Sequence, residues 1–320
     1  MPPVEAPTLA DVRAARERLA GLVLRTPLVR LAVEGVPAEI HLKLESLQPI
    51  GSFKLRGATN AMALAGPEGL RDGVYTASAG NMAQGVAWSA RRLGVAATAI
   101  VPDHAPEAKL SALARLGARV EKVPFDQWWQ VLVEHGQPGR EGLFLHPVCD
   151  RAVMAGNGTI GLEILEDLPD VETVLVPYGG GGLSCGIAAA LRGSGARARV
   201  MACEVDTAAP LSAALAAGRP VPTSYTPSFV DGIGAKSVLA EMWPLASRLL
   251  DGALSSSLAD VAAAVRLLAE RAHVVSEGAG AAPLAAALSG RAGGGKTVCV
   301  VSGGNIDAGV LARILSGEMP

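Results

Sequence analysis

The chain has 320 residues, which is enough for one large or two moderate domains, each with its own core. Half of the residues are hydrophobic, only 3% are aromatic and 38 are glycine, a composition that favours packed α/β layers over an all-β sandwich. The formal net charge of −2 provides no basic face, so nucleic acid is not expected as a partner.

Apolar periodicity predicts alternating strands and helices along the chain. A helix begins after Thr8, with Asp11 placed to complete a capping box, and runs to about Leu22. Strands are expected at 28–31, 40–44, 74–77, 97–101, 119–123, 143–145, 173–176, 200–204 and 297–301. Helices are expected at 82–93, 106–116, 127–134, 153–168, from 183, 210–217, 235–249, 258–272 and 281–288.

This order predicts a two-domain α/β fold in which each domain is a sheet flanked by helices. The larger domain comprises residues 1–72 and 148–320, and the smaller, residues 73–147, is inserted into it. No apolar run reaches the roughly 18 residues needed to cross a bilayer, and no secretory signal pattern opens the chain, so we expect a cytoplasmic protein without a membrane partner. The four cysteines form no C-x-x-C pair and have no histidine at metal-ligand spacing, which predicts small buried side chains.

Four segments at strand ends or helix starts carry candidate chemistry. In GSFKLRG, residues 51–57, Lys54 stands between two apolar residues, where an amine has a lowered pKa and can attack an aldehyde. Taken alone, the pattern also fits a solvated lysine at a helix start. In TASAGN, residues 76–81, small residues would let backbone N–H groups approach an anion, although a simple helix cap is the alternative.

The other two segments are rich in glycine. PYGGGGL, residues 177–183, has a backbone free to point several N–H groups at one phosphate, and it matches neither a P-loop nor G-x-G-x-x-G. In VSGGN, residues 301–305, the hydroxyl of Ser302 could form a hydrogen bond with the ring nitrogen of a ligand. The alternative interpretation is that this segment is only a turn.

In order and spacing the chain resembles the threonine/serine dehydratases and serine racemases, pyridoxal-phosphate (PLP) enzymes of fold type II, the tryptophan synthase β-like group. The resemblance covers nearly the whole chain and rests on the motifs KLESLQPIGSFKLRGA (43–58), TASAGNMAQGVA (76–87), AGNGTIGLEIL (155–165), PYGGGGLSCGIA (177–188), DGI (231–233), SEGAGAAPLAA (276–286) and SGGNID (302–307).

The resemblance implies the cofactor pyridoxal 5'-phosphate and a role for each matching residue. Lys54 is implied as the Schiff-base lysine and base for the α-proton, with Phe53 packed beside the cofactor. Asn81 bonds the phenolic oxygen and Ser302 faces the pyridine nitrogen. The phosphate cradle is formed by Gly179, Gly180, Gly181 and Gly182, and the substrate carboxylate loop by Ser78, Ala79, Gly80, Asn81 and Met82.

The implied reaction is α,β-elimination of water from a small β-hydroxy amino acid, which yields a 2-keto acid and ammonia, in a homodimer. A serine-type racemase is the alternative, but Ala79 stands where the racemases carry the serine that acts as the opposite-face acid. Met82 stands where relatives usually carry a histidine. The sequence FDQWW (125–129) suggests a further alternative, a dehydratase for a larger substrate such as phenylserine. β-Replacement, a non-catalytic PLP carrier and a nucleotide-binding module are the remaining alternatives.

A divalent cation site is not expected. Glu204 matches an acidic residue that metal-activated relatives use, so it is a weak candidate ligand. The residues after it offer no second carboxylate at the matching position, because Pro210 stands there.

Overall fold

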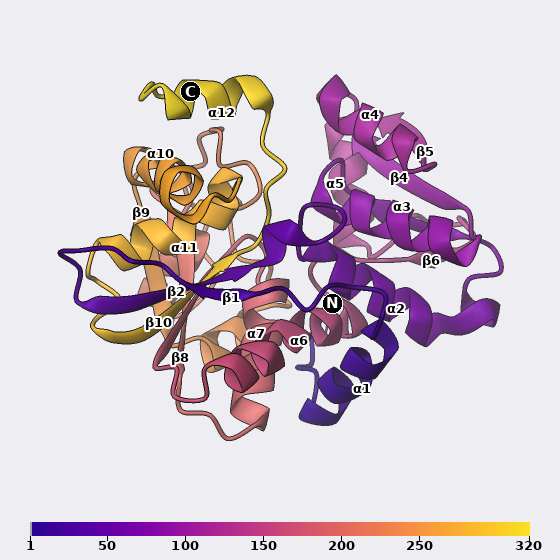
Figure 1. The fold of residues 1–320 in the computed structure, drawn as a ribbon. Coiled ribbons are helices and arrows are strands. Elements are labelled where there is room, and N and C mark those ends of the chain that lie inside the picture. Colours follow the sequence, from indigo (N-terminus) through magenta and orange to yellow (C-terminus); the bar gives the residue numbers. More distant parts are fainter. Residues whose placement is uncertain (1) are drawn as a thin grey trace.

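A computed structural model describes residues 2–320, apart from the side chain of Ala108, and places ten strands in two sheets (Figure 1). The larger sheet has the order β1-β2-β10-β7-β8-β9 and is parallel except for the β1–β2 pair. Its strands are β1 (Leu28–Arg30), β2 (Ala38–Leu44), β7 (Thr173–Pro177), β8 (Arg199–Val205), β9 (Gly252–Ser256) and β10 (Gly295–Val301). The mixed α/β architecture predicted from the sequence is confirmed.

The smaller sheet is fully parallel, with the order β5-β4-β3-β6. It consists of β3 (Val74–Ala77), β4 (Ala97–Pro102), β5 (Arg119–Val123) and β6 (Leu143–Phe144). Three helices belong to this unit, namely α3 (Asn81–Leu93), α4 (Glu107–Arg115) and α5 (Phe125–Val133), and Figure 1 shows them grouped with β4, β5 and β6 on the right.

The larger sheet is accompanied by helices from both ends of the chain. They are α1 (Leu9–Leu19), α6 (Arg151–Asp167), α7 (Gly182–Gly193), α8 (Pro210–Ala217), α9 (Trp243–Leu249), α10 (Leu258–Leu267), α11 (Gly278–Leu288) and α12 (Ala308–Leu315). The central strand β7 is buried along its whole length, as expected for a parallel strand covered on both faces. In the described part of the chain, no helix is both long and apolar enough to span a membrane.

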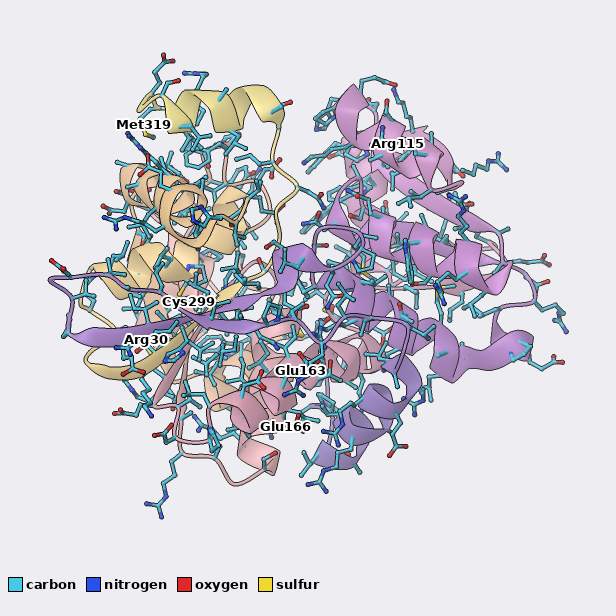
Figure 2. All side chains as sticks on the ribbon, in the orientation of Figure 1. Arg30, Arg115, Glu163, Glu166, Cys299 and Met319 are labelled. Carbon is cyan, nitrogen blue, oxygen red and sulfur yellow. The ribbon has the colours of Figure 1, made fainter. Side chains whose placement is uncertain are left out.

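Helix α2 (Lys54–Gly69) joins the two units, because it packs against α3 of the smaller one and α6 of the larger one. A buried ion network holds its first turn. Arg56, only 1% exposed, donates to Glu45 at 2.8 Å and to Glu163 of α6 at 2.6 Å. Lys43 Nζ also lies 2.6 Å from Glu163, which is labelled in Figure 2. Burial raises the pKa of Glu45, but the Arg56 guanidinium outweighs it and holds that pKa below its usual value.

Most predicted elements are confirmed within a few residues, and the predicted helix at 235–249 is wrong over its first half. Only α9 is helical there, and Pro244 occupies its first turn. A proline in a helix interior would lose a hydrogen bond and clash with the carbonyl four residues earlier, so the helix begins at Trp243. The first helix ends at Leu19 rather than Leu22, although its Thr8–Asp11 capping box is present as predicted. Strand β9 and helices α2 and α12 were not among the predicted elements, although Lys54 was considered as a possible helix start.

Candidate active site

A cavity of about 470 Å³ lies where the strand ends of the two sheets meet. Its walls include the start of α2, the β3–α3 loop, the β7–α7 loop and the segment after β10. Ligands of open α/β sheets bind at the carboxyl ends of the strands, and this cavity has that location. It brings together all the site residues expected from the sequence except Glu204, namely Phe53, Lys54, Ser78, Ala79, Gly80, Asn81, Met82, Gly179, Gly180, Gly181, Gly182 and Ser302.

Lys54 is the first residue of α2 and extends its amine into this cavity. The Nζ atom donates a hydrogen bond to the Pro147 carbonyl at 2.8 Å and lies 5.1 Å from the centre of the Phe53 ring. Burial lowers the pKa of Lys54 to about 8, while the nearby Glu277 carboxylate opposes that change. A large share of the amine is therefore neutral near pH 8 and able to act as a nucleophile or base.

The four-glycine loop is pressed against the segment that carries Val148. A Cβ atom on Gly180 would lie 2.5 Å from Val148 Cγ2, and one on Gly182 would lie 2.8 Å from the Val148 carbonyl oxygen. Gly181 has φ of +99°, a conformation that side chains disfavour. The loop leads directly into α7, so its backbone amides stand at a helix N-terminus, where a phosphate is favoured. Close contact at Gly180 and Gly182 and the positive φ of Gly181 thus favour glycine at these three positions, whereas a Cβ on Gly179 would make ordinary contacts of 3.5 Å. The loop suits an anion.

Substituting Gly180→Ala tests this loop. The added methyl group would displace Val148 or the loop, so we expect cofactor affinity to fall by about tenfold or more. Equilibrium titration of the cofactor-free protein, followed by visible absorbance, measures the dissociation constant. The double variant with Val148→Ala should recover part of the lost affinity, because it removes the two atoms that approach most closely. An unchanged dissociation constant for Gly180→Ala would refute the tight packing of the loop.

Asn81 is held by a chain of side-chain hydrogen bonds. Its Nδ2 donates to Glu277 Oε1 at 2.9 Å, and its Oδ1 accepts from Asn305 Nδ2 at 2.7 Å. Glu277 precedes α11 and is 7% exposed, and burial raises its pKa to about 7. The sequence analysis missed Glu277 as a site residue, although it lies inside the quoted motif SEGAGAAPLAA. An acidic residue among small residues at a helix start was the available signal.

Comparison with known proteins identifies the family. The family model described as "Pyridoxal-phosphate dependent enzyme" matches residues 19–304. The chain belongs to this family. Its cofactor is therefore pyridoxal phosphate, as expected from the sequence, and the buried Lys54 amine with its lowered pKa and the glycine loop fit that group.

Similar proteins include several dehydratases. The chain is 40% identical to an L-threonine ammonia-lyase of Thermotoga maritima over 97% of its own length and 78% of the relative. It is 42% identical to an L-threonine ammonia-lyase of Geobacter sulfurreducens over 95% and 77%. Among solved structures, maize serine racemase matches with a TM-score of 0.89 and 29% identity, covering 98% of both chains. A threonine deaminase from Solanum lycopersicum matches with a TM-score of 0.86 and 29% identity, covering 98% of this chain and 91% of the other.

Ser302 of this PLP enzyme follows β10 and is tied to the lysine segment. Its carbonyl accepts from the Phe53 backbone N–H at 3.0 Å, and Gly304 N donates to Gly51 O at 2.9 Å. Lys54 and Ser302 are therefore fixed relative to each other by backbone hydrogen bonds, although 248 positions separate them in the numbering. The start of α2 and the segment after β10 therefore form one rigid unit at the cavity.

The loop expected to bind the substrate carboxylate follows β3. Ser78 Oγ accepts from the Gly80 N–H at 3.2 Å, which holds the turn that begins α3. Ala79 lines the cavity with a methyl group and offers no proton. Met82 is 2% exposed and packs in an apolar cluster with Ala58 and Val86, while it also contributes to the cavity wall.

Glu204 lies at the end of β8, outside the cavity, and its carboxylate has protein partners. Its oxygens accept from the backbone N–H groups of Leu211 at 2.7 Å and Ser212 at 2.9 Å, and from Ser212 Oγ at 2.6 Å. Burial raises the pKa of Glu204 despite these bonds. The carboxylate thus caps the start of α8, which accounts for its position without a cation.

The expectation that no histidine lies near a cysteine at metal-ligand spacing is wrong. Ligand atoms of His135, His146, Cys149 and Glu241 lie within 4.8 Å of one another, and the H-x-x-C spacing of residues 146–149 was the overlooked signal. These atoms bond within the protein, because His146 Nδ1 accepts from the backbone of Val148 and Cys149, at 3.0 and 2.8 Å. His135 Nε2 pairs with Glu241 at 2.8 Å. The cluster thereby fixes the segment that faces Lys54 and the glycine loop.

Proposed function

We propose that this PLP enzyme is an ammonia-lyase whose preferred substrate is L-threonine. It would remove water from L-threonine to give a 2-keto acid and ammonia. The observation that carries the proposal is the Lys54 amine, which is partly neutral near pH 8 and faces the glycine loop and the β3–α3 loop in one cavity. L-Threonine ammonia-lyases about 40% identical over most of both chains support it. L-Serine is proposed as a second substrate.

The bound cofactor supplies an electron sink for negative charge at the substrate α-carbon. Lys54 would hold the cofactor covalently and, once released, take the α-proton through its neutral amine. The glycine loop and the start of α7 would bind the phosphate. The uncharged hydroxyl of Ser302 would form a hydrogen bond with the ring nitrogen of the cofactor. Asn81, which Glu277 and Asn305 orient, would form a hydrogen bond with its phenolic oxygen.

A substrate panel tests this assignment directly. The purified holoenzyme should release keto acid and ammonia from L-threonine, and at a lower rate from L-serine, with a visible absorbance band from the bound cofactor. Absence of keto-acid release from both amino acids by cofactor-loaded enzyme would overturn the assignment.

Racemisation is the alternative activity, because maize serine racemase matches this structure with a TM-score of 0.89. Inverting the configuration at the α-carbon needs an acid that returns a proton on the face opposite Lys54, and the methyl group of Ala79 cannot supply one. We expect Ala79→Ser to raise the ratio of serine racemisation to elimination by about tenfold or more. Chiral chromatography alongside keto-acid release measures both rates, and abundant racemisation by the unaltered enzyme would contradict this view.

The pH dependence of covalent cofactor attachment should show whether the Glu277 carboxylate raises the pKa of Lys54. An amine attacks only when neutral, so the rate at which PLP binds covalently should rise as pH increases through the Lys54 pKa of about 8. Glu277→Gln removes a carboxylate that raises this pKa, so the midpoint should move down by about half a pH unit or more. The growth of visible absorbance after PLP addition measures the rate. The exposed Glu270→Gln serves as control, and a midpoint that stays or rises for Glu277→Gln is the contrary result.

Three further assignments belong to this proposal. We infer a large PLP-binding domain of residues 1–72 and 148–320 and a small domain of 73–147, because the two sheets and their helices divide there. We also infer a homodimer, which light scattering would test, and a cytoplasmic location.

A further inference from the structure

Aromatic side chains gather at the mouth of the cavity. Phe125 and Trp128 of α5 line it from the small sheet side, and Tyr225 lines it from the long loop after α8. Phe125 is 46% exposed and Tyr225 is 41% exposed. Only 3% of the chain is aromatic, so exposed aromatic rings around one opening indicate a surface that binds something.

The topology places these rings beside the substrate loop. Strands β3, β4 and β5 are parallel neighbours, so their carboxyl ends open on one edge of the sheet. The loop of residues 78–80 follows β3, His104 follows β4, and Phe125 begins α5 after β5. A substrate whose carboxylate is bound on the first of these loops therefore has its side chain next to the other two.

The rings form a connected wall. The centres of the His104 and Phe125 rings are 5.9 Å apart, and those of Phe125 and Trp128 are 5.5 Å apart, with tilted planes. Trp128 packs on the buried residues Tyr75, Ala77 and Ile100 of the small sheet, which fixes its ring. Aromatic pairs at such separations favour a further ring in tilted contact.

The charged groups at the mouth are already paired with each other. Lys109 Nζ lies 2.7 Å from Asp231 Oδ2, and His104 Nδ1 lies 3.1 Å from Asp103 Oδ1. A second carboxylate on a substrate would therefore have to compete with Asp231 for Lys109 and with Asp103 for His104. The chemistry of the mouth thus favours an apolar, aromatic side chain over an acidic one.

We infer that the side-chain subsite accepts an aryl group, so that β-hydroxy amino acids with an aromatic ring on the β-carbon are substrates. This inference rests on the proposed dehydratase function and concerns its selectivity. Phe125 and Trp128 supply the face of the subsite, and the elimination itself is unchanged, with the β-hydroxyl leaving as water and the amino group released as ammonia.

Steady-state kinetics of the holoenzyme with L-threonine, L-threo-3-phenylserine and L-threo-3-hydroxyaspartate tests the inference. The unaltered enzyme should turn over phenylserine with kcat/KM no lower than one tenth of that for threonine, and should leave hydroxyaspartate essentially unused. Phe125→Ala and Trp128→Leu should each lower kcat/KM for phenylserine by about tenfold, with a change of about threefold or less for threonine. Trp129→Ala is the matched control, because Trp129 is the next residue of α5, is 44% exposed and does not line the cavity.

An inhibition measurement with amino acids that lack a β-hydroxyl tests binding of the aryl group separately from the elimination reaction. L-Phenylalanine has no β-hydroxyl to lose, so it should compete with threonine and inhibit more strongly than L-2-aminobutyrate, and Phe125→Ala should abolish that preference. Turnover of threonine without turnover of phenylserine, or equal inhibition by the two analogues, would overturn the aryl subsite and leave the dehydratase assignment intact. Failure of all three hydroxy amino acids would instead remove the dehydratase assignment itself.

Discussion

Lys54→Ala should lower threonine turnover by about 10³-fold or more, because the side chain that would both hold the cofactor and take the α-proton is lost. The visible band of the covalently bound cofactor should disappear with it. Keto-acid release and an absorbance spectrum of the same preparation measure the two effects. Lys54→Arg should be equally inactive, since a guanidinium keeps its proton at every working pH and cannot act as a base.

The matched control for this experiment is Lys122→Ala, which removes an exposed lysine of β5. It should retain the activity and the spectrum of the unaltered enzyme. Circular dichroism should show the same fold for all of these variants, since within the described residues Lys54 Nζ makes a single hydrogen bond, to Pro147 O. Retention of a tenth or more of the activity by Lys54→Ala would remove Lys54 from the mechanism.

Arg56→Met should destabilise the protein by about 3–5 kcal/mol, because it leaves the buried carboxylate of Glu45 without its ion-pair partner and Glu163 with Lys43 alone. The methionine fills part of the space, so the loss comes from uncompensated buried charge, mainly on Glu45, more than from a void. The melting temperature should fall by roughly 5–15 °C, measured by calorimetry on the cofactor-free protein. Activity should fall as well, since Arg56 holds the first turn of the helix that begins with Lys54.

Arg16→Met provides the comparison, because Arg16 pairs with Glu166 at the surface, where both side chains are more than 40% exposed. Exposed pairs contribute about 1 kcal/mol or less, so its melting temperature should change little. In the Arg56→Met background, Glu45→Gln should cost less than it does alone, because the carboxylate that it removes has then already lost its ion-pair partner. Equal effects of Arg16→Met and Arg56→Met would show that the buried network does not stabilise the fold.

Much of the fold was predictable because local signals agreed with tertiary packing. The Thr8–Asp11 capping box and the helix at Pro210–Ala217 were found from short patterns that the structure retains. Strand β9 was missed because its residues, GALSS, are small and carry little apolar signal; the strand is defined by pairing with β8. The predicted helix start at residue 235 was wrong because Pro244 fits only in the first turn of a helix, so α9 begins at Trp243.

The site was predictable where one segment carries its own chemistry, as with Lys54 and the four glycines. Glu277 was missed because its effect depends on burial and on its bond to Asn81, 196 residues away, and neither is visible in a local pattern. For the cluster around Cys149, the H-x-x-C spacing was visible in the sequence, but His135 and Glu241 reach it from other elements and could not be assigned to it from a local pattern. The role of Glu204 as a helix cap likewise follows only from where α8 begins.

Strand β10 is the last strand of the chain, yet it lies between β2 and β7 inside the larger sheet. During synthesis, the preceding strands would therefore wait with unpaired edges on both sides of the gap until this final strand emerges from the ribosome. Contacts of such long sequence separation slow folding, and open strand edges favour association between chains. The candidate cofactor site can therefore form only after the strand that leads to Ser302 has been inserted between β2 and β7.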